Sequence, residues 1–151
     1  MDNPYERDLD RNAANHQPLT PLVYLERAAR TYPDHIAIIH GGQRISSRDF
    51  WRRSLKLASA LARRGIGKGD TVTVMLSNTP PMLEAHFGVP MTKAVLHSLN
   101  TRLDAAIIAF QIDHAETKVL IVDRERTGAV REALALAKTK PLVVDYDDPD
   151  Y

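Results

Sequence analysis

The 151-residue sequence contains no cysteine. This absence excludes a disulfide scaffold, a cysteine nucleophile, a cysteine-ligated zinc site and an iron–sulfur cluster, and it predicts a reducing, cytoplasmic location. The sequence also lacks any apolar run near the roughly 18 residues that a membrane span requires, and its polar first residues do not resemble a signal peptide. What remains, 44% hydrophobic and 26% charged residues, is typical of a soluble globular domain that buries its core without disulfides or metal.

The net charge of +1 results from an uneven distribution, because four of the 19 acidic residues lie in the last seven positions. Between Arg44 and Lys68 there are eight basic residues and one acid, and Arg48, Arg52 and Lys56 share one face of a predicted helix. Nucleic-acid or phosphate binding is one interpretation of this face. No helix-turn-helix or RNA-binding motif accompanies it, so we favour a solvated helix face and expect no nucleic-acid partner.

The first half of the chain predicts two helices and a hairpin. Thr20-Pro21 is a preferred helix start, and this helix should stop before Pro33. Strands at 36–40 and 44–46 flank a Gly-Gly turn. Ser46 or Ser47 should cap the next helix, whose expected apolar face is Phe50 or Trp51, Leu55, Ala58, Leu61 and Ala62.

The second half alternates strands with helices. Strands are expected at 71–76, 94–97, 118–122 and 142–145, with helices between them, one of them capped by Asp104. Such alternation implies parallel strands joined by crossovers. The predicted fold is α/β: an open, mostly parallel sheet with helices on both faces and a β-hairpin near the N-terminus.

Gly65–Asp70 has the spacing G-x-G-x-G, which invites comparison with a phosphate-binding loop. However, it follows a predicted helix and precedes a strand. Phosphate loops need the reverse order, since the N–H groups come from a helix N-terminus. We therefore interpret Gly65 as a helix stop, with Ile66 making the accompanying hydrophobic contact.

No histidine or serine forms a recognisable catalytic or metal motif. None of the histidines has a ligand partner at the i, i+4 helical spacing, and the adjacent Asp113 and His114 should not face each other on a helix. His86 is expected in the core or at an interface, whereas Ser77 lacks a nucleophile elbow. The histidines are His16, His35, His40, His86, His97 and His114.

Polar residues follow two of the predicted parallel strands. Ser77-Asn78 comes after the first, and Asn100-Thr101-Arg102 comes after the second. The carboxyl ends of parallel strands meet at one edge, where ligands of open α/β sheets bind. We favour the interpretation that these are turn residues together with a surface arginine. Contact with a ligand stays the alternative interpretation.

Three stretches resemble the start of acyl-CoA synthetases, members of the adenylate-forming (AMP-binding) superfamily. They are the helix-to-hairpin opening, the pattern A-x-x-L-x-x-x-G-I-x-x-G-D-x-V over 58–72, and the segments S-N-T-P and L-N-T-R-L-D. The resemblance runs from about Leu19 to Tyr151, and the most similar subgroup activates fatty and other medium-sized carboxylic acids. Departures at Met91–Lys93, and at Arg126 where an aromatic is usual, are interpreted as tolerated surface changes.

The resemblance implies an enzyme that uses ATP and Mg²⁺ to convert a carboxylic acid into an acyl-adenylate and pyrophosphate. Coenzyme A then displaces AMP to give the thioester. Family members are several-fold longer and depend on a Ser/Thr/Gly-rich phosphate loop ending in Pro-Lys. This chain has no such loop, and Lys140-Pro141 is in the reverse order. We therefore assign it no catalytic, cofactor-binding or metal-binding residue.

We accordingly expect the N-terminal segment of an acyl-CoA synthetase, inactive on its own. It divides into an extended arm (1–18), a partial α/β subdomain of the AMP-binding domain (19–144) and an acidic connector (145–151). Carboxylic acid, ATP and CoA would be substrates of the full-length protein, and the chain itself would contact the remainder of that protein or a second copy. The alternative is a non-catalytic interaction or oligomerisation module derived from the same family.

Overall fold

Four parallel strands form the central sheet in the computed structural model, which describes residues 8, 10, 12–14 and 16–147. The strand order is β4-β3-β5-β6. Strand β3 pairs in parallel with β4 and β5, and β5 pairs with β6. The strands are β3 (Thr71–Met75), β4 (Val95–Ser98), β5 (Thr117–Asp123) and β6 (Leu142–Tyr146).

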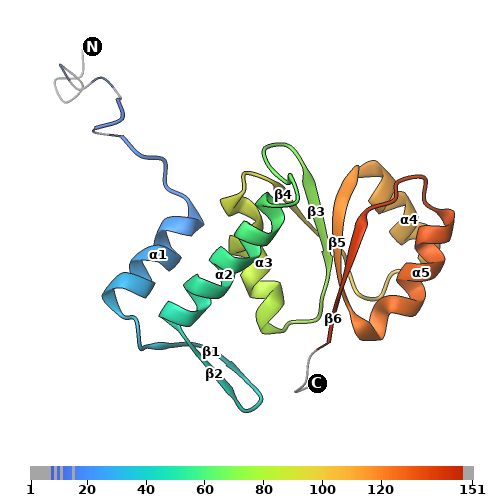
Figure 1. Cartoon of the computed structure of the whole chain (residues 1–151), viewed down its shortest axis with the longest axis horizontal. Coiled ribbons are helices and arrows are strands. Elements are labelled where there is room, and N and C mark those ends of the chain that lie inside the picture. The colour runs from blue at the N-terminus through green and yellow to red at the C-terminus, as the bar shows by residue number, and fades with distance from the viewer. Residues whose placement is uncertain (1–7, 9, 11, 15, 148–151) are drawn as a thin grey trace, which may run out of the picture.

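Helices cover both faces of this sheet, as the sequence predicts. Helices α2 (Ser47–Ala62) and α3 (Pro80–Met91) lie on one face, and α4 (Ala105–His114) and α5 (Thr127–Leu136) lie on the other (Figure 1). A short 3₁₀ helix, η2 (Arg124–Arg126), precedes α5. Among the described residues, no helix is long and apolar enough to cross a membrane.

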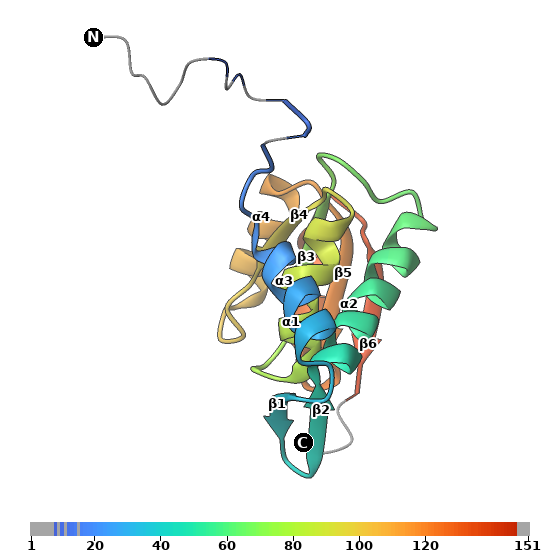
Figure 2. The same cartoon turned by 90° about the vertical axis from the view of Figure 1, so that its left-hand side faces the viewer.

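An N-terminal unit packs on the outer side of α2 and α3. Helix α1 (Pro21–Thr31) lies against these helices on the side away from the sheet, and the antiparallel hairpin of β1 (Ile36–His40) and β2 (Gln43–Ser46) extends beside it (Figure 2). The predicted hairpin is therefore confirmed. Most of the first ten residues of the expected arm, and 148–151 of the connector, lie outside the described residues.

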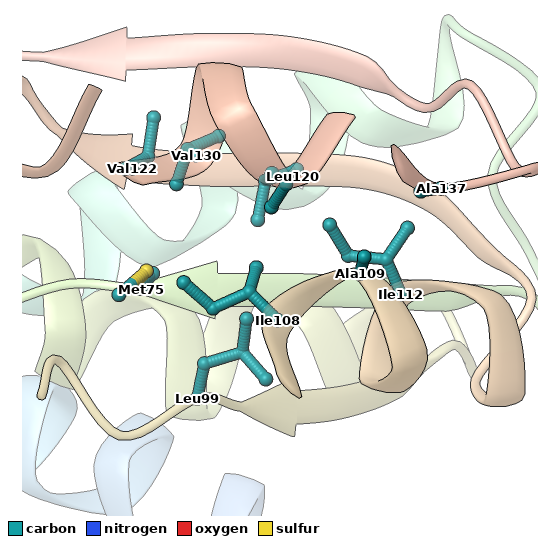
Figure 3. Close-up of a cluster of buried hydrophobic side chains, with 10 residues drawn as sticks. Met75, Leu99, Ile108, Ala109, Ile112, Leu120, Val122, Val130 and Ala137 are labelled. Carbon is teal, nitrogen blue, oxygen red and sulfur yellow. The ribbon is translucent and has the colours of Figure 1, made fainter. Parts of the chain in front are cut away.

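Hydrophobic clusters fill the space on each side of the sheet. The cluster beneath α4 and α5 is drawn in Figure 3 and includes Met75, Ile108, Ile112, Leu120 and Val130. On the opposite face, alternate residues of the same strands meet α2 and α3 in a second cluster. A third, smaller cluster joins α1, the hairpin and α2 through Leu25, Ile38, Ile45 and Phe50.

The buried face of α2 differs from the expected one. Leu55 is 43% exposed and Ala62 is also exposed, whereas Ser54 is completely buried. The reason is a close approach to α3: a Cβ on Gly88 would lie 2.9 Å from the Ser54 carbonyl oxygen. The small Ser54 side chain, whose hydroxyl donates to the Phe50 carbonyl at 2.9 Å, permits this contact. Helix–helix packing therefore turns the helix away from its simplest apolar pattern.

Local signals at the ends of α2 act largely as predicted. The Ser46 hydroxyl accepts a hydrogen bond from the Asp49 N–H at 3.1 Å and caps the helix. Ser47 is not a cap: its hydroxyl donates to the His35 carbonyl. At the other end, Gly65 adopts a positive φ of 79°, and the Ile66 N–H donates to the Leu61 carbonyl at 3.1 Å. This confirms the glycine stop.

Candidate functional site

The two polar loops singled out in the sequence lie together at the carboxyl edge of the sheet. They line a cleft of about 530 Å³ between the β3–α3 and β4–α4 connections. Its walls comprise Leu76, Ser77, Asn78, Thr79, Met82, Leu99, Asn100, Thr101, Arg102 and Arg126. The expectation that these loops share one edge is therefore confirmed, and the edge is where ligands of open α/β sheets usually bind.

Hydrogen bonds hold the second loop of the cleft in place. The Leu99 N–H donates to the Val74 carbonyl at 2.9 Å and ties the second loop to β3. Within that loop, the Asn100 side-chain oxygen accepts from the Arg102 N–H at 2.9 Å. The cleft is thus built on ordered turns rather than on loose chain ends.

Asp123 is a residue of this edge that sequence reasoning missed. It ends β5, is 7% exposed, and its carboxylate accepts a hydrogen bond from the Ser77 N–H. An acidic residue at the end of a buried apolar strand was the available signal. Next to it lies a small hollow of about 40 Å³, flanked by the 2.6 Å ion pair between Arg124 and Asp147.

The wider cleft has cationic but no acidic side chains in its walls. Arg102 is exposed, and none of the ion pairs among the described residues involves it. Arg126 is half-buried; its Nε has no hydrogen-bond partner, and Glu125 lies 3.8 Å from its terminal nitrogen. The fold places Arg126, interpreted from the sequence as a tolerated surface change, in the wall of this cleft.

Helix starts at this edge offer few free N–H groups. Helix α3 begins with Pro80 and Pro81, which have no N–H, and the Met82 N–H donates to the Thr79 carbonyl. At α4, the Asp104 carboxylate caps the Ile107 N–H at 2.9 Å, as predicted. A triphosphate needs a row of unoccupied N–H groups, and these two helix starts do not supply one.

The glycine-rich segment lies at the opposite edge of the sheet, between α2 and the start of β3. The Gly67 N–H donates to the Asp70 carboxylate at 2.8 Å, so the protein's own acid occupies the donor. Gly69 has a φ of 88°, typical of a turn. The turn interpretation is confirmed.

The histidines remain separate from the cleft, and the described part of the chain holds no cluster of three or more potential metal ligands. His97 shares a buried polar group with Thr73 and Thr117: its Nδ1 lies 3.1 Å from the Thr73 hydroxyl, which lies 2.7 Å from that of Thr117. Burial lowers the pKa of His97 below its usual 6.5, and the nearby charge of His114 lowers it further.

His86 and Asp113 lie in surroundings that the sequence did not predict. His86 is exposed, with Nδ1 2.8 Å from the Met82 carbonyl oxygen, so the expectation of a core position was wrong and the interface position stays a prediction. The helix is apolar nearly all round, and packing against α2 selects the Ala85 side instead. Asp113 faces the α5–β6 loop, whose Thr139 and Lys138 N–H groups lower the pKa of its carboxyl.

The basic face of α2 is partly neutralised. Arg48 pairs with Asp34 at 3.2 Å, and Arg52 pairs with Asp49 at 2.7 Å. Both guanidinium groups are more than half exposed. This arrangement is that of a solvated helix face.

The family model described as "AMP-binding enzyme" matches residues 25–150 of the chain. The chain belongs to the AMP-binding enzyme family. The match includes both loops of the cleft and the whole central sheet.

Relatives in the AMP-binding family include an acetate/butyrate–CoA ligase of Arabidopsis thaliana, 44% identical over 133 residues. The peroxisomal benzoate–CoA ligase of the same plant is 43% identical over 133 residues. Each match covers 88% of this chain and 23% of the relative, so the chain spans about a quarter of their length. It corresponds to an N-terminal part of such AMP-binding enzymes.

Solved structures of AMP-binding enzymes have the same fold. The o-succinylbenzoate–CoA synthetase of Bacillus subtilis, determined in complex with AMP, superimposes with a TM-score of 0.69 at 25% identity. The superposition covers 85% of this chain and 31% of that one. The predicted fold class, a parallel α/β sheet with an N-terminal hairpin, is thereby confirmed.

Proposed function

We propose that this chain is the N-terminal segment of an AMP-forming acyl-CoA ligase. In that reaction a carboxylic acid and ATP give an acyl-adenylate and pyrophosphate, and coenzyme A then displaces AMP. The match to acetate/butyrate–CoA ligase over nearly the whole chain carries the proposal. Small or medium-sized carboxylic acids are the substrates that this match and the benzoate relative favour.

The second part of the proposal is that the chain has no ligase activity by itself. Adenylyl transfer depends on placed cations and N–H groups around the phosphates. The residues described here do not fit Mg²⁺·ATP: they hold no acidic metal-binding cluster, and Pro80, Pro81 and Asp104 leave few free N–H donors at the two helix starts. The contribution of this chain is therefore structural, and nucleotide chemistry would reside in the remainder of the protein.

A chimera tests the first part. The matched N-terminal quarter of the Arabidopsis acetate/butyrate–CoA ligase would be replaced by this chain, and butyryl-CoA formation would be measured. We expect thioester formation by the chimera and none by the same ligase lacking that quarter. A soluble, folded chimera without activity would contradict the proposal.

Calorimetry and a thioester assay on the isolated chain test the second part. We expect no thioester and no micromolar affinity for Mg²⁺·ATP. Either a measurable turnover or micromolar ATP binding would overturn the inactivity.

The cytoplasmic location expected from the lack of cysteine stays a prediction, and the two plant relatives are named as peroxisomal.

A second candidate function is self-association as a non-catalytic module, which β6 favours. This edge strand exposes Leu142, Val143 and Val144 by 46%, 36% and 41%. Exposed edge strands readily pair with another chain. Antiparallel pairing of β6 with β6 in a second copy would bring the basic end, with Lys138 and Lys140, beside the acidic end of the partner, with Asp145 and Asp147.

Light scattering during size-exclusion chromatography tests this candidate. We expect a dimer for the unaltered chain and a monomer for Val143→Lys, because the new charge would repel across the two-fold axis. Ile107→Lys, at a similarly exposed site on α4, should leave the dimer intact. A wild-type monomer at micromolar concentration would exclude the module.

A further inference from the structure

The amino edge of the central sheet carries an excess of basic side chains. All four strands begin at this edge, at the top of Figure 1, and helices α2, α3, α4 and α5 end beside it. Seven exposed basic residues lie in the connections at this edge or within two residues of the start of a strand. These residues, which we call the amino-edge surface, are Arg63, Arg64, Lys68, Lys93, Lys118, Lys138 and Lys140.

The positive charge of the amino-edge surface is not neutralised by neighbouring acids. None of its seven cations forms an ion pair with an acid in the part of the chain that the structure describes. Asp70, Asp113 and Glu116 lie at the same edge. The Asp70 and Asp113 carboxylates already accept backbone N–H groups. The edge therefore keeps a net positive charge that an external anion can meet.

Helix capping accounts for only part of this basic composition. The Lys140 ammonium donates to the Ala137 carbonyl at 2.7 Å, at the end of α5, where the helix dipole favours a cation. By contrast, the ammonium groups of Lys68, Lys93 and Lys118 donate no hydrogen bond to another described residue. These charges serve no partner within the described fold and are available to a binding partner.

Exposed apolar side chains lie among the cations. Leu136, at the end of α5, is 63% exposed, and Leu142, at the start of β6, is 46% exposed. Phe110 of α4 is 66% exposed and lines a shallow depression together with Lys138. Leu142 lines a second depression together with Arg64. The amino-edge surface therefore combines positive charge with apolar groups.

We propose that the amino-edge surface docks this chain on an anionic phospholipid membrane. Each Lys or Arg near such a membrane strengthens binding about fivefold. The side chains of Phe110, Leu136 and Leu142 enter the boundary between headgroups and acyl chains, where apolar groups are buried. Nucleic acid is a poorer match, because its interfaces with proteins are more polar and its phosphates gain nothing from exposed leucines. Docking does not depend on ligase activity.

Co-sedimentation of the 151-residue chain with lipid vesicles tests the proposal. We expect the chain to sediment with phosphatidylcholine vesicles that contain about 30% phosphatidylserine, at about 1 mM lipid and about 0.1 M salt. Vesicles of phosphatidylcholine alone should bind about tenfold more weakly, and about 0.5 M salt should release the chain, because it screens the charges. Equal binding to both kinds of vesicle, or binding to neither, would overturn the proposal.

A double variant with a matched control tests the role of the basic residues. Arg64→Gln combined with Lys68→Gln should weaken binding to the phosphatidylserine vesicles about tenfold or more, because two cations leave the surface. Arg44→Gln combined with Arg48→Gln removes the same charge from two exposed sites near the hairpin, away from the amino edge (Figure 1). That control should bind like the unaltered chain. Equal losses in both double variants would show a net-charge effect and overturn the assignment.

A second pair of variants tests the apolar contribution. Leu136→Gln should weaken vesicle binding about fivefold or more, because a side chain that enters the membrane is lost. Ile39→Gln, at a 67% exposed site on the hairpin, should leave binding unchanged. Duplex DNA is the comparison ligand. If DNA bound as tightly as the vesicles, and Leu136→Gln weakened neither, nucleic acid would replace the membrane as the partner and the proposal would be overturned.

The result is independent of the chimera experiment. Absence of vesicle binding would overturn the docking surface and leave the ligase proposal intact. Conversely, an inactive chimera together with phosphatidylserine-dependent binding would overturn only the ligase proposal.

Discussion

Helix caps are the clearest single-residue effects in this chain. Ser46 and Thr20 both occupy N-cap positions with extended backbone. The Ser46 hydroxyl accepts the Asp49 N–H and donates to the Asp49 carboxylate at 3.0 Å. Thr20 makes no side-chain capping bond, and the start of α1 depends on Pro21 instead. Two residues of preferred N-cap type therefore contribute differently to the stability of their helices.

Replacing the two caps by alanine tests this difference. Ser46→Ala should lower the free energy of unfolding by about 1 kcal/mol, because the α2 N-terminus loses a bonded donor. Thr20→Ala should change it by only a few tenths of that amount. Urea unfolding followed by circular dichroism measures both, and equal losses would contradict the capping assignment.

Close packing of α2 on α3 is the main contact between elements outside the sheet. Gly88 permits the approach, Phe50 and Phe87 pack edge to face with centroids 5.2 Å apart, and Arg53 pairs with Glu84. Glu84 is 8% exposed, so this ion pair lies at the helix interface rather than in solvent. The contact combines shape, aromatic geometry and one partly buried charge pair.

Gly88→Ala should lower the free energy of unfolding by about 1–3 kcal/mol, because the new Cβ overpacks the interface. It would meet the Ser54 backbone oxygen and the Leu57 side chain at 2.9 Å. Gly128→Ala is the matched control, since its Cβ meets nothing within 4 Å. That change should stabilise helix α5 by about 0.5–1 kcal/mol. Opposite signs in thermal or urea unfolding are the expected result.

His97, on β4, should make the stability of the fold depend on pH. Because burial lowers its folded-state pKa, the unfolded chain binds more protons between that lowered value and 6.5. The free energy of unfolding should therefore fall as the pH drops below 6.5. Above pH 6.5 His97 is neutral in both states, and this destabilisation is absent.

The change in Tm between about pH 7.5 and about pH 5 measures this effect. The loss of Tm on acidification should be smaller in His97→Gln than in the unaltered chain. His16→Gln, at an exposed site, should show the unaltered loss. An undiminished loss in His97→Gln would show that its burial does not contribute.

The molecule as a whole is organised around one shared sheet. Leu120 and Val119 belong to the same strand but face opposite clusters. The N-terminal unit joins this body through α2, which carries Phe50 of the third cluster and Leu61 of the second. We therefore expect the described fold to unfold in one cooperative transition.

Leu120→Ala tests whether the sheet and the N-terminal unit unfold together. Leu120 is completely buried beneath α4 and α5, so its truncation should cost about 3 kcal/mol. Trp51, the single tryptophan, lies on α2 and packs against the third cluster. Its fluorescence and far-UV circular dichroism should shift to the same lower urea midpoint. An unchanged fluorescence midpoint would mean that the N-terminal unit unfolds independently.

Much of the candidate site was predictable from local order. Ser77-Asn78 and Asn100–Arg102 each follow a short apolar strand, and parallel pairing brings such ends together. The place of Arg126 was not predictable in the same way. It reaches the cleft wall only because β5 lies beside β3, a pairing between residues more than forty positions apart.

The sequence by itself determined the alternation of strands and helices, a cap at Ser46 or Ser47, the cap at Asp104, the glycine stop at Gly65 and the family pattern. Each of these depends on neighbours a few residues away, where backbone geometry and hydrogen bonding decide. Only the tertiary structure decided which helix faces are buried and which charges meet. Those outcomes depend on contacts between distant segments, such as Gly88 against Ser54, that no local pattern encodes.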